Sequence, residues 1–118
     1  MGLLDKLRTP IAEHDRLKLA DFCAAVPGVT PIAELKPRSY ATVVGEITSV
    51  RIVPKDDGSP WLEATIKDGT GAMVVMWTGR RRMPGIRTGR RLKLSGRGAP
   101  SGTASRLKVL NPEYELLG

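Results

Sequence analysis

The stretch YATVVGEITSVRIVPKDDGSPWLEATIKDGTGAMVVMW, residues 40–77, decides the fold, because it holds three β-strand patterns separated by two turns. The first pattern, residues 40–53, is rich in β-branched residues, which favour strands. It carries Gly45 in its middle, and a glycine inside a long strand often marks a bulge or a sharp bend. Residues 61–66 alternate between apolar and polar side chains, and residues 67–71 (KDGTG) are typical of a hairpin turn. The stretch therefore predicts a bent, antiparallel sheet.

Two more strands are predicted after this stretch. Residues 91–96 (RLKLSG) and 106–110 (RLKVL) alternate, with leucine and valine on one face and arginine and lysine on the other. The intervening loop, residues 97–105, is rich in glycine and serine. Five short strands in about 80 residues fit a small closed barrel of the OB-fold type, whereas a sandwich needs about seven strands. The predicted class is an all-β, five-stranded OB-fold barrel.

The first third of the chain is predicted to be helical. Thr9 and Pro10 form a typical helix start, with threonine as the N-cap and proline in the first turn. An apolar stripe at helical spacing follows and ends before Pro27, comprising Leu19, Phe22, Cys23 and Val26. A second short turn of helix is expected over Pro31–Lys36. We therefore expect a helical extension, residues 1–36, before an OB-fold domain, residues 37–118.

Positive charge is concentrated in one third of the chain. The net charge is +7, and residues 78–108 hold ten of the 19 lysines and arginines and none of the 12 acidic residues. The rest of the chain therefore has nine basic residues against 12 acidic ones. Charge that serves only solubility is spread more evenly and mixed in sign. A one-sided positive field attracts polyanions, and nucleic acid is the most abundant of these in a cell.

Catalysis and metal binding have no basis in the sequence. His14 is the only histidine and Cys23 the only cysteine, so the chain cannot assemble a zinc site or an internal disulfide. Cys23 lies on the apolar stripe and is expected to be a core residue. No phosphate-loop or dinucleotide motif is present. We expect a protein without enzymatic activity, cofactor or metal, located in the cytoplasm and without a membrane span.

Four short motifs resemble a known family. They are VVGEITSV, KDGTGAMVVMWTGRR, RLKLSGR and NPEY, in this order along the chain. Together they resemble the OB-fold wedge domain of RecG-type helicases, and the chain is also similar to short, free-standing bacterial OB-fold proteins. The resemblance covers residues 36–118 and implies an OB-fold domain that binds nucleic acid. OB-folds also serve as protein-binding modules, so the motifs indicate the fold more strongly than the function.

Stacking of bases on exposed aromatic residues is common in nucleic-acid-binding OB-folds, yet this chain has only five aromatic residues. Trp77 shares the parity of Met73 and Val75 and is expected in the core. Trp61 faces away from Leu62 and is the best stacking candidate. Binding is thus expected to rest mainly on charge. The candidate nucleic-acid-binding residues are Arg80, Arg81, Arg82, Arg87, Arg90, Arg91, Lys93, Arg97, Arg106, Lys108 and Trp61.

The predicted partner is nucleic acid, either single-stranded or branched DNA, or RNA, bound through phosphates with little sequence preference. Arginine suits this role because its planar guanidinium binds phosphate in a bidentate manner. One alternative is that these arginines only cap the barrel end and cover apolar surface with their stems. Another is an adaptor that binds a protein partner through the barrel and the N-terminal helix. A basic amphipathic helix for adhesion to lipid is not evident.

Overall fold

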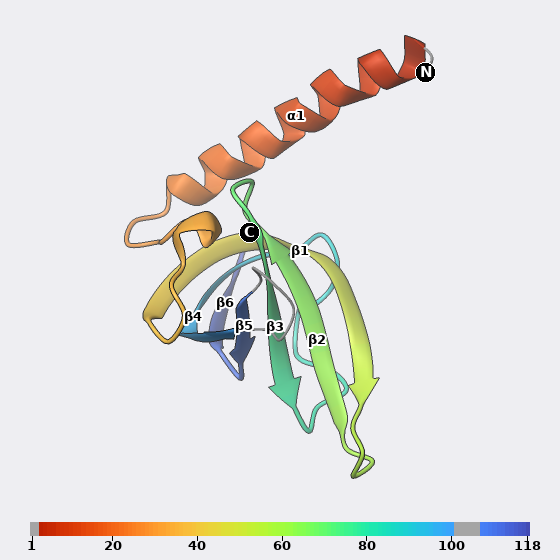
Figure 1. The fold of residues 1–118 in the computed structure, drawn as a ribbon, viewed down its shortest axis with the longest axis vertical. Helices are drawn as coiled ribbons and strands as arrows, with labels where there is room; N and C mark the ends of the chain where they lie inside the picture. The colour runs from red at the N-terminus through yellow and green to blue at the C-terminus, as the bar shows by residue number, and fades with distance from the viewer. Residues whose placement is uncertain (1–2, 101–106) are drawn as a thin grey trace.

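An N-terminal helix and a six-stranded sheet make up the computed structural model, which describes residues 3–100 and 107–118 (Figure 1). The elements in chain order are α1 (Leu3–Ala24), the 3₁₀ turn η1 (Ile32–Glu34), β1 (Tyr40–Pro54), β2 (Pro60–Lys67), β3 (Ala72–Thr78), β4 (Arg91–Pro100), β5 (Leu107–Leu110) and β6 (Glu113–Leu117). Within the described ranges no helix is long and apolar enough to cross a bilayer.

The sheet closes on itself because β1 pairs with two different strands. Its first half, Tyr40–Glu46, pairs antiparallel with β4, and its second half, Glu46–Pro54, pairs antiparallel with β2. The ring is completed by the pairs β2–β3, β3–β5 and β4–β5, of which only β3–β5 is parallel. The prediction of a five-stranded closed barrel is confirmed.

Gly45 lies where β1 passes from β4 to β2. A Cβ atom at this position would lie 2.5 Å from Cγ2 of Ile66 and 2.9 Å from the carbonyl oxygen of Lys67. Both contacts are too short for any side chain larger than hydrogen. The pairing with β2 also shifts register between Ile47 and Ser49, which marks a β-bulge. The predicted bend therefore combines a close backbone approach with a bulge, and both increase strand curvature.

Substitution of Gly45 by alanine is expected to lower the free energy of unfolding by about 1–3 kcal/mol, because the added methyl group overlaps Ile66 and the backbone of Lys67. Urea denaturation measures this loss. Ser49→Ala is the control, since Ser49 is exposed on the same strand and should change stability by less than about 0.5 kcal/mol. Equal stability of both variants would show that β1 can bend without a glycine.

Alternation along the strands places the predicted residues in the barrel interior. Leu62, Leu92 and Leu94 are buried, as the sequence indicates. Trp77 is only 3% exposed, which confirms it as a core residue. Its ring packs edge-on against Tyr114, with ring centroids 5.6 Å apart. Trp77 can therefore take no part in base stacking at the surface.

The C-terminal tail forms β6, a strand that the sequence pattern does not predict. Strands β5 and β6 both pair with β4, with Val109 opposite Gly98 and Glu113 opposite Ser95. The break between them is Asn111, whose φ of 49° is in the left-handed region. The Asn111 side chain accepts a hydrogen bond from the backbone N–H of Thr78 at 3.0 Å, so β3 is held where β5 ends. Only contact with β4 makes this short tail a strand.

The helix α1 begins at Leu3, so the predicted start at Thr9 and Pro10 is wrong. Residues 3–8 include leucine, lysine and arginine, which favour helix strongly enough to extend it before the proline. Pro10 thus lies inside the helix, where it supplies no N–H for the carbonyl four residues earlier. The predicted short turn over Pro31–Lys36 is observed as η1. Figure 1 shows that α1 meets the barrel along its C-terminal half, with its N-terminal end pointing away.

Candidate nucleic-acid interface

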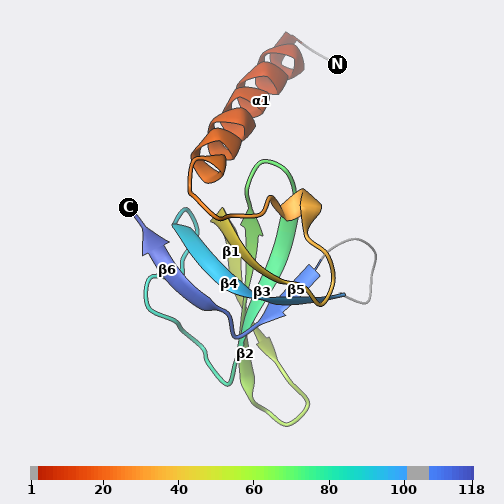
Figure 2. The ribbon, with the colours of Figure 1, turned by 90° about the vertical axis from the view of Figure 1, so that its left-hand side faces the viewer.

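The segment between β3 and β4, residues 79–90, is the connector, and it carries most of the predicted arginines. It contains no helix and runs beside β6 (Figure 2). Its apolar residues anchor it: Ile86 is buried in the barrel core, and Met83 packs against that core. The hydroxyl of Tyr114 donates a hydrogen bond to the carbonyl of Pro84 at 2.9 Å. The middle of the connector is therefore fixed to the barrel.

Gly85 allows the connector to lie this close to β6. Its φ is +73°, a left-handed conformation that side chains rarely adopt, and a Cβ atom there would lie 2.1 Å from Cδ1 of Leu116. At its far end the connector is held by β1, since the N–H of Gly89 donates to the carbonyl of Ile47 at 2.8 Å. The Ile47 N–H in turn donates to the carbonyl of Arg90 at 2.8 Å. The connector is thus held at its middle and at its end.

The arginine side chains of the connector point outward from this fixed backbone. Arg80, Arg81, Arg82 and Arg87 are exposed, and Arg90 is half-buried. In the described part of the chain none of the five forms an ion pair. Their positive charge is therefore not neutralised by an acidic neighbour there, and it is available to an anionic ligand.

Trp61 lies at the same end of the barrel as Arg80–Arg82. It pairs with Thr78, the last residue of β3, and the connector begins one residue later. Leu62 is buried and Trp61 half-buried, so the two face opposite ways as predicted. The ammonium of Lys55, in the turn between β1 and β2, lies 4.2 Å from the centre of the Trp61 ring. One face of the indole is thus already covered by a cation.

Arg91 differs from the connector arginines because its charge is matched. Its Nε lies 3.3 Å from Oε1 of Glu46, and its guanidinium lies 4.3 Å from the centre of the Phe22 ring. Both contacts tie β4 to neighbouring elements, and the second ties it to α1. Arg91 therefore has a structural role that its place in the basic segment does not reveal.

The remaining predicted residues lie on two other surfaces. Lys93 and Arg97 project from the outer face of β4, opposite Val44 and Tyr40 of β1. Lys108 lies on β5, between Val74 of β3 and Ala99 of β4. Arg106 falls outside the described residues. The nine described basic positions thus belong to the connector, to β4 and to β5.

Asp68 is buried, and it is not among the functional residues predicted from the sequence. Its Oδ2 accepts a hydrogen bond from the N–H of Ile32 at 2.9 Å. Its Oδ1 accepts bonds from the N–H and the hydroxyl of Thr70, at 2.8 and 2.7 Å, and from the N–H of Gly71 at 3.1 Å. The aspartate followed two residues later by threonine is the sequence signal, since such a pair forms its own turn. This carboxylate joins the β2–β3 turn to η1.

The β2–β3 turn also supports α1. A Cβ atom on Gly69 would lie 2.7 Å from Cβ of Ala20, so the helix packs directly on the glycine backbone. Arg16 donates a hydrogen bond from Nη1 to the carbonyl of Gly69 at 2.7 Å. Nearby, Cys23 is buried, as predicted, and burial raises the pKa of its thiol to about 11. The thiol is therefore protonated and unreactive at neutral pH.

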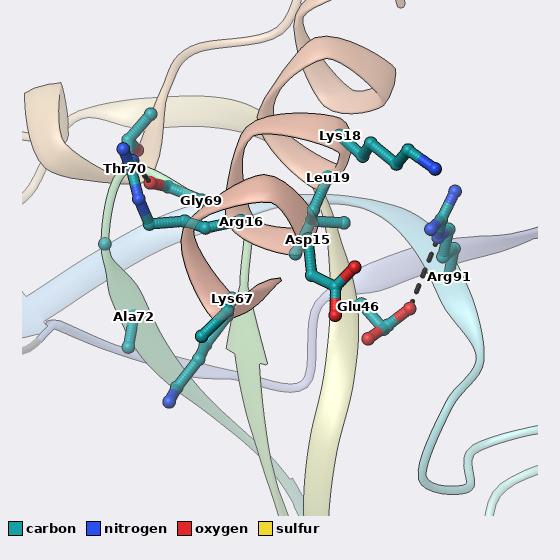
Figure 3. A pocket seen from close by; sticks show the side chains of 12 residues that line it. Asp15, Arg16, Lys18, Leu19, Glu46, Lys67, Gly69, Thr70, Ala72 and Arg91 are labelled. Atoms are coloured by element: carbon teal, nitrogen blue, oxygen red, sulfur yellow. Dashed lines mark hydrogen bonds and ion pairs between the residues drawn. The ribbon is translucent and has the colours of Figure 1, made fainter. Parts of the chain in front are cut away.

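A groove of about 780 Å³ lies between α1 and the barrel (Figure 3). Its charged lining is mixed: Arg91 faces Glu46 across the dashed ion pair, and Asp15 lies near Lys18. The groove therefore offers an anion no one-sided field, in contrast to the connector. Among the described residues no cluster of three or more metal-ligating side chains occurs.

Three solved structures share the architecture of this chain. RecG bound to a three-way DNA junction matches 74% of the chain with 20% identity and a TM-score of 0.62, although the match spans only 12% of the RecG chain. The mitochondrial single-stranded DNA-binding protein Rim1 of S. cerevisiae matches 68% of the chain and 96% of its own, with 16% identity and a TM-score of 0.53. The second OB-fold domain of replication protein A from Methanococcus maripaludis matches 71% of the chain and 91% of its own, with 19% identity and a TM-score of 0.50.

Comparison with protein-family models and with curated proteins finds no match for this sequence. At 16–20% identity, the structural matches establish the fold alone. They agree with the strand order, in which β1 closes the ring by pairing with both β2 and β4. The chain therefore has the OB-fold, with a helix docked on the turn between its second and third strands.

Proposed function

We propose that this protein binds nucleic acid without catalysing a reaction on it, through phosphate contacts and with little sequence preference. The observation that carries the proposal is the connector: a backbone fixed by Ile86 and Tyr114 presents Arg80–Arg82 and Arg87 to solvent without acidic partners among the described residues. Cations carried on a fixed backbone bind phosphate with less loss of conformational entropy than cations on a mobile loop. Contacts to phosphates carry no base identity, which accounts for the low sequence preference.

The affinity for a single-stranded oligonucleotide is expected to fall steeply with salt. If about four phosphates are neutralised, log K against log salt concentration should have a slope near −3. Fluorescence anisotropy with two labelled oligonucleotides of unrelated sequence measures this, and both should give the same slope. Absence of binding at about 50 mM salt, or affinity that does not respond to salt, would contradict the proposal.

Trp61 is proposed as a base platform beside the arginines, because its side chain is half-buried and faces away from the buried Leu62. Trp61→Ala is expected to weaken single-strand binding about tenfold, because a stacked base contributes about 1–3 kcal/mol. Trp61→Phe should retain most of the affinity. Anisotropy titrations of both variants, with melting temperatures to confirm folding, test this; equal affinity of the alanine variant and the parent protein would exclude stacking there.

A second candidate function is a protein-binding adaptor that uses α1. It is favoured by the exposure of all side chains from Ala12 to Lys18 and by the projection of the helix away from the barrel (Figure 1). Removing residues 1–15 tests it, because this truncation takes away the exposed residues before Arg16 and keeps the hydrogen bond from Arg16 to the carbonyl of Gly69. The adaptor function is supported if the truncated protein binds nucleic acid normally but loses a protein partner that stays bound to the full chain after nuclease treatment.

A further inference from the structure

Tyr40 is the first residue of β1, and its side chain is 60% exposed. Val43 belongs to the barrel core, so Thr42 and Val44 lie with Tyr40 on the opposite face of the strand, where Val44 is itself covered. Tyr40 therefore lies on the outer surface of the barrel, over the pairing of β1 with β4. Tyr40 is therefore accessible to a ligand on that face.

Three cationic residues lie near Tyr40 in the sequence or opposite it in the sheet. Arg97 is the direct partner of Tyr40 across the β1–β4 pair, and Lys36 and Arg38 precede β1. All three are exposed, and none of them is in an ion pair within residues 3–100 and 107–118. On this face the nearest acidic residue by register is Glu113, which lies opposite Ser95, two residues before Arg97 along β4.

Arg38 and Arg97 are positioned by hydrogen bonds. The N–H of Arg38 donates to the carbonyl of Gly98 at 2.7 Å, and Nη1 of Arg97 donates to the carbonyl of Arg38 at 3.1 Å. These bonds hold Arg38 in a left-handed conformation with a φ of 68°, which non-glycine residues adopt only when their surroundings fix it. The Arg97 guanidinium and the Arg38 backbone are thus held at the start of β1, two residues before Tyr40 along the chain.

The other aromatic rings of the described chain already have partners. Lys55 covers a face of Trp61, and Arg91 covers a face of Phe22. Trp77 and Tyr114 pack against each other. No cation covers Tyr40 in the described part of the chain, since the Arg97 guanidinium bonds to the Arg38 backbone instead. Tyr40 is thus an exposed aromatic ring with an open face and flanking cations that are free to bind an anion.

We infer that Tyr40, Arg38 and Arg97 form a subsite for one unpaired nucleotide of single-stranded nucleic acid. The base stacks on the Tyr40 ring, and the guanidinium groups of Arg38 and Arg97 bind the adjacent phosphates. This inference rests on the proposed function and extends the ligand across the barrel. Trp61 pairs with Val53 near the end of β1, whereas Tyr40 begins the strand, so the two platforms lie at opposite ends of β1.

The subsite is selective for single strands. In a duplex each base is stacked between its neighbours and paired, so its face is not available to a tyrosine ring. Phosphates are present in both forms. The ring therefore distinguishes unpaired from paired nucleotides, and the arginines add affinity for either.

The experiment compares Tyr40→Ala, Tyr40→Phe and the double variant Arg38→Gln/Arg97→Gln by anisotropy, with a labelled single strand and the corresponding duplex over a salt series. Tyr40→Ala should weaken single-strand binding about tenfold with an unchanged salt slope, while Tyr40→Phe stays within about twofold. The double glutamine variant should make the slope less negative by about 1.4, because it loses two phosphate contacts at about 0.7 each. Duplex affinity should be unaffected by Tyr40→Ala.

Leu17→Ala is the matched control, because Leu17 is 48% exposed on α1 and its truncation removes apolar surface away from this subsite. The melting temperatures of the Tyr40 and Leu17 variants should equal that of the parent, and that of the double variant should fall only slightly, since it loses one exposed hydrogen bond. Normal single-strand binding by both Tyr40→Ala and the double variant, in a protein whose parent binds with the expected salt slope, overturns the subsite and leaves the proposed function intact. A parent protein that binds no single strand overturns both.

Discussion

Replacement of Arg80, Arg81 and Arg82 together by glutamate is expected to lower the affinity for a single-stranded oligonucleotide by about 100-fold at about 50 mM salt. Three phosphate contacts are lost, and three negative charges then repel the ligand at the same place. The melting temperature should not change, because these side chains are exposed and have no ion-pair partner among the described residues. Anisotropy titration and thermal unfolding measure the two quantities.

The control reverses charge at the other end of β2. Lys18 and Lys67 line the groove beside α1, and Lys67 ends the strand that begins next to Trp61. Lys18→Glu/Lys67→Glu should weaken binding less than about fivefold, since it changes only the long-range field, which salt screens. Similar losses in both variants would mean that net charge, and not the connector, governs binding. A triple glutamate variant with full affinity would exclude the connector as the phosphate site.

Replacement of Asp68 by alanine is expected to lower the free energy of unfolding by about 3 kcal/mol or more, because it leaves buried N–H donors without an acceptor. The donors include the N–H groups of Ile32, Thr70 and Gly71, from η1 and the β2–β3 turn. Asp68→Asn should lower the free energy of unfolding by less, since asparagine keeps one acceptor oxygen. Urea denaturation monitored by circular dichroism gives both values.

Asp57→Ala is the matched control for Asp68. Asp57 accepts analogous bonds from the N–H and the hydroxyl of Ser59, at 2.9 and 2.6 Å, but it is exposed in the β1–β2 turn. Water can replace those bonds, so the free energy of unfolding of this variant should fall by less than about 1 kcal/mol. Faster proteolysis of α1 is also expected in Asp68→Ala, because the helix rests on the turn that Asp68 organises. If both variants lost the same free energy of unfolding, burial of Asp68 would make no contribution to stability beyond that of an exposed aspartate.

Most of the barrel could be predicted from the sequence because strand alternation is a local signal. The parity of Leu62 and Trp77 identified both as interior residues, and Gly45 marked the bend of β1. The strand β6 could not be predicted in this way, since its five residues are strand only through pairing with β4. The predicted helix start was wrong for a different reason. Pro10 is compatible with the first turn of a helix, but also with an interior position when its neighbours favour helix.

The candidate site was predictable in charge but not in geometry. The absence of acidic residues between positions 78 and 108 indicated a polyanion site, and Trp61 was identified by its parity. Nothing in the local sequence revealed that Arg91 is matched by Glu46, or that Arg97 stands opposite Tyr40. Each of these pairs joins residues that are 45 or more positions apart in the sequence.

The sequence by itself determined the strands, the side of each strand that faces the core, and the segment that holds the positive charge. These follow from period-two alternation and composition, which depend on neighbouring residues only. The tertiary structure alone decided which cations are free, because Arg91 meets Glu46 and Phe22 only once β4, β1 and α1 come together. It also decided that Tyr40 has an open ring beside Arg97, since register between distant strands sets which side chains meet.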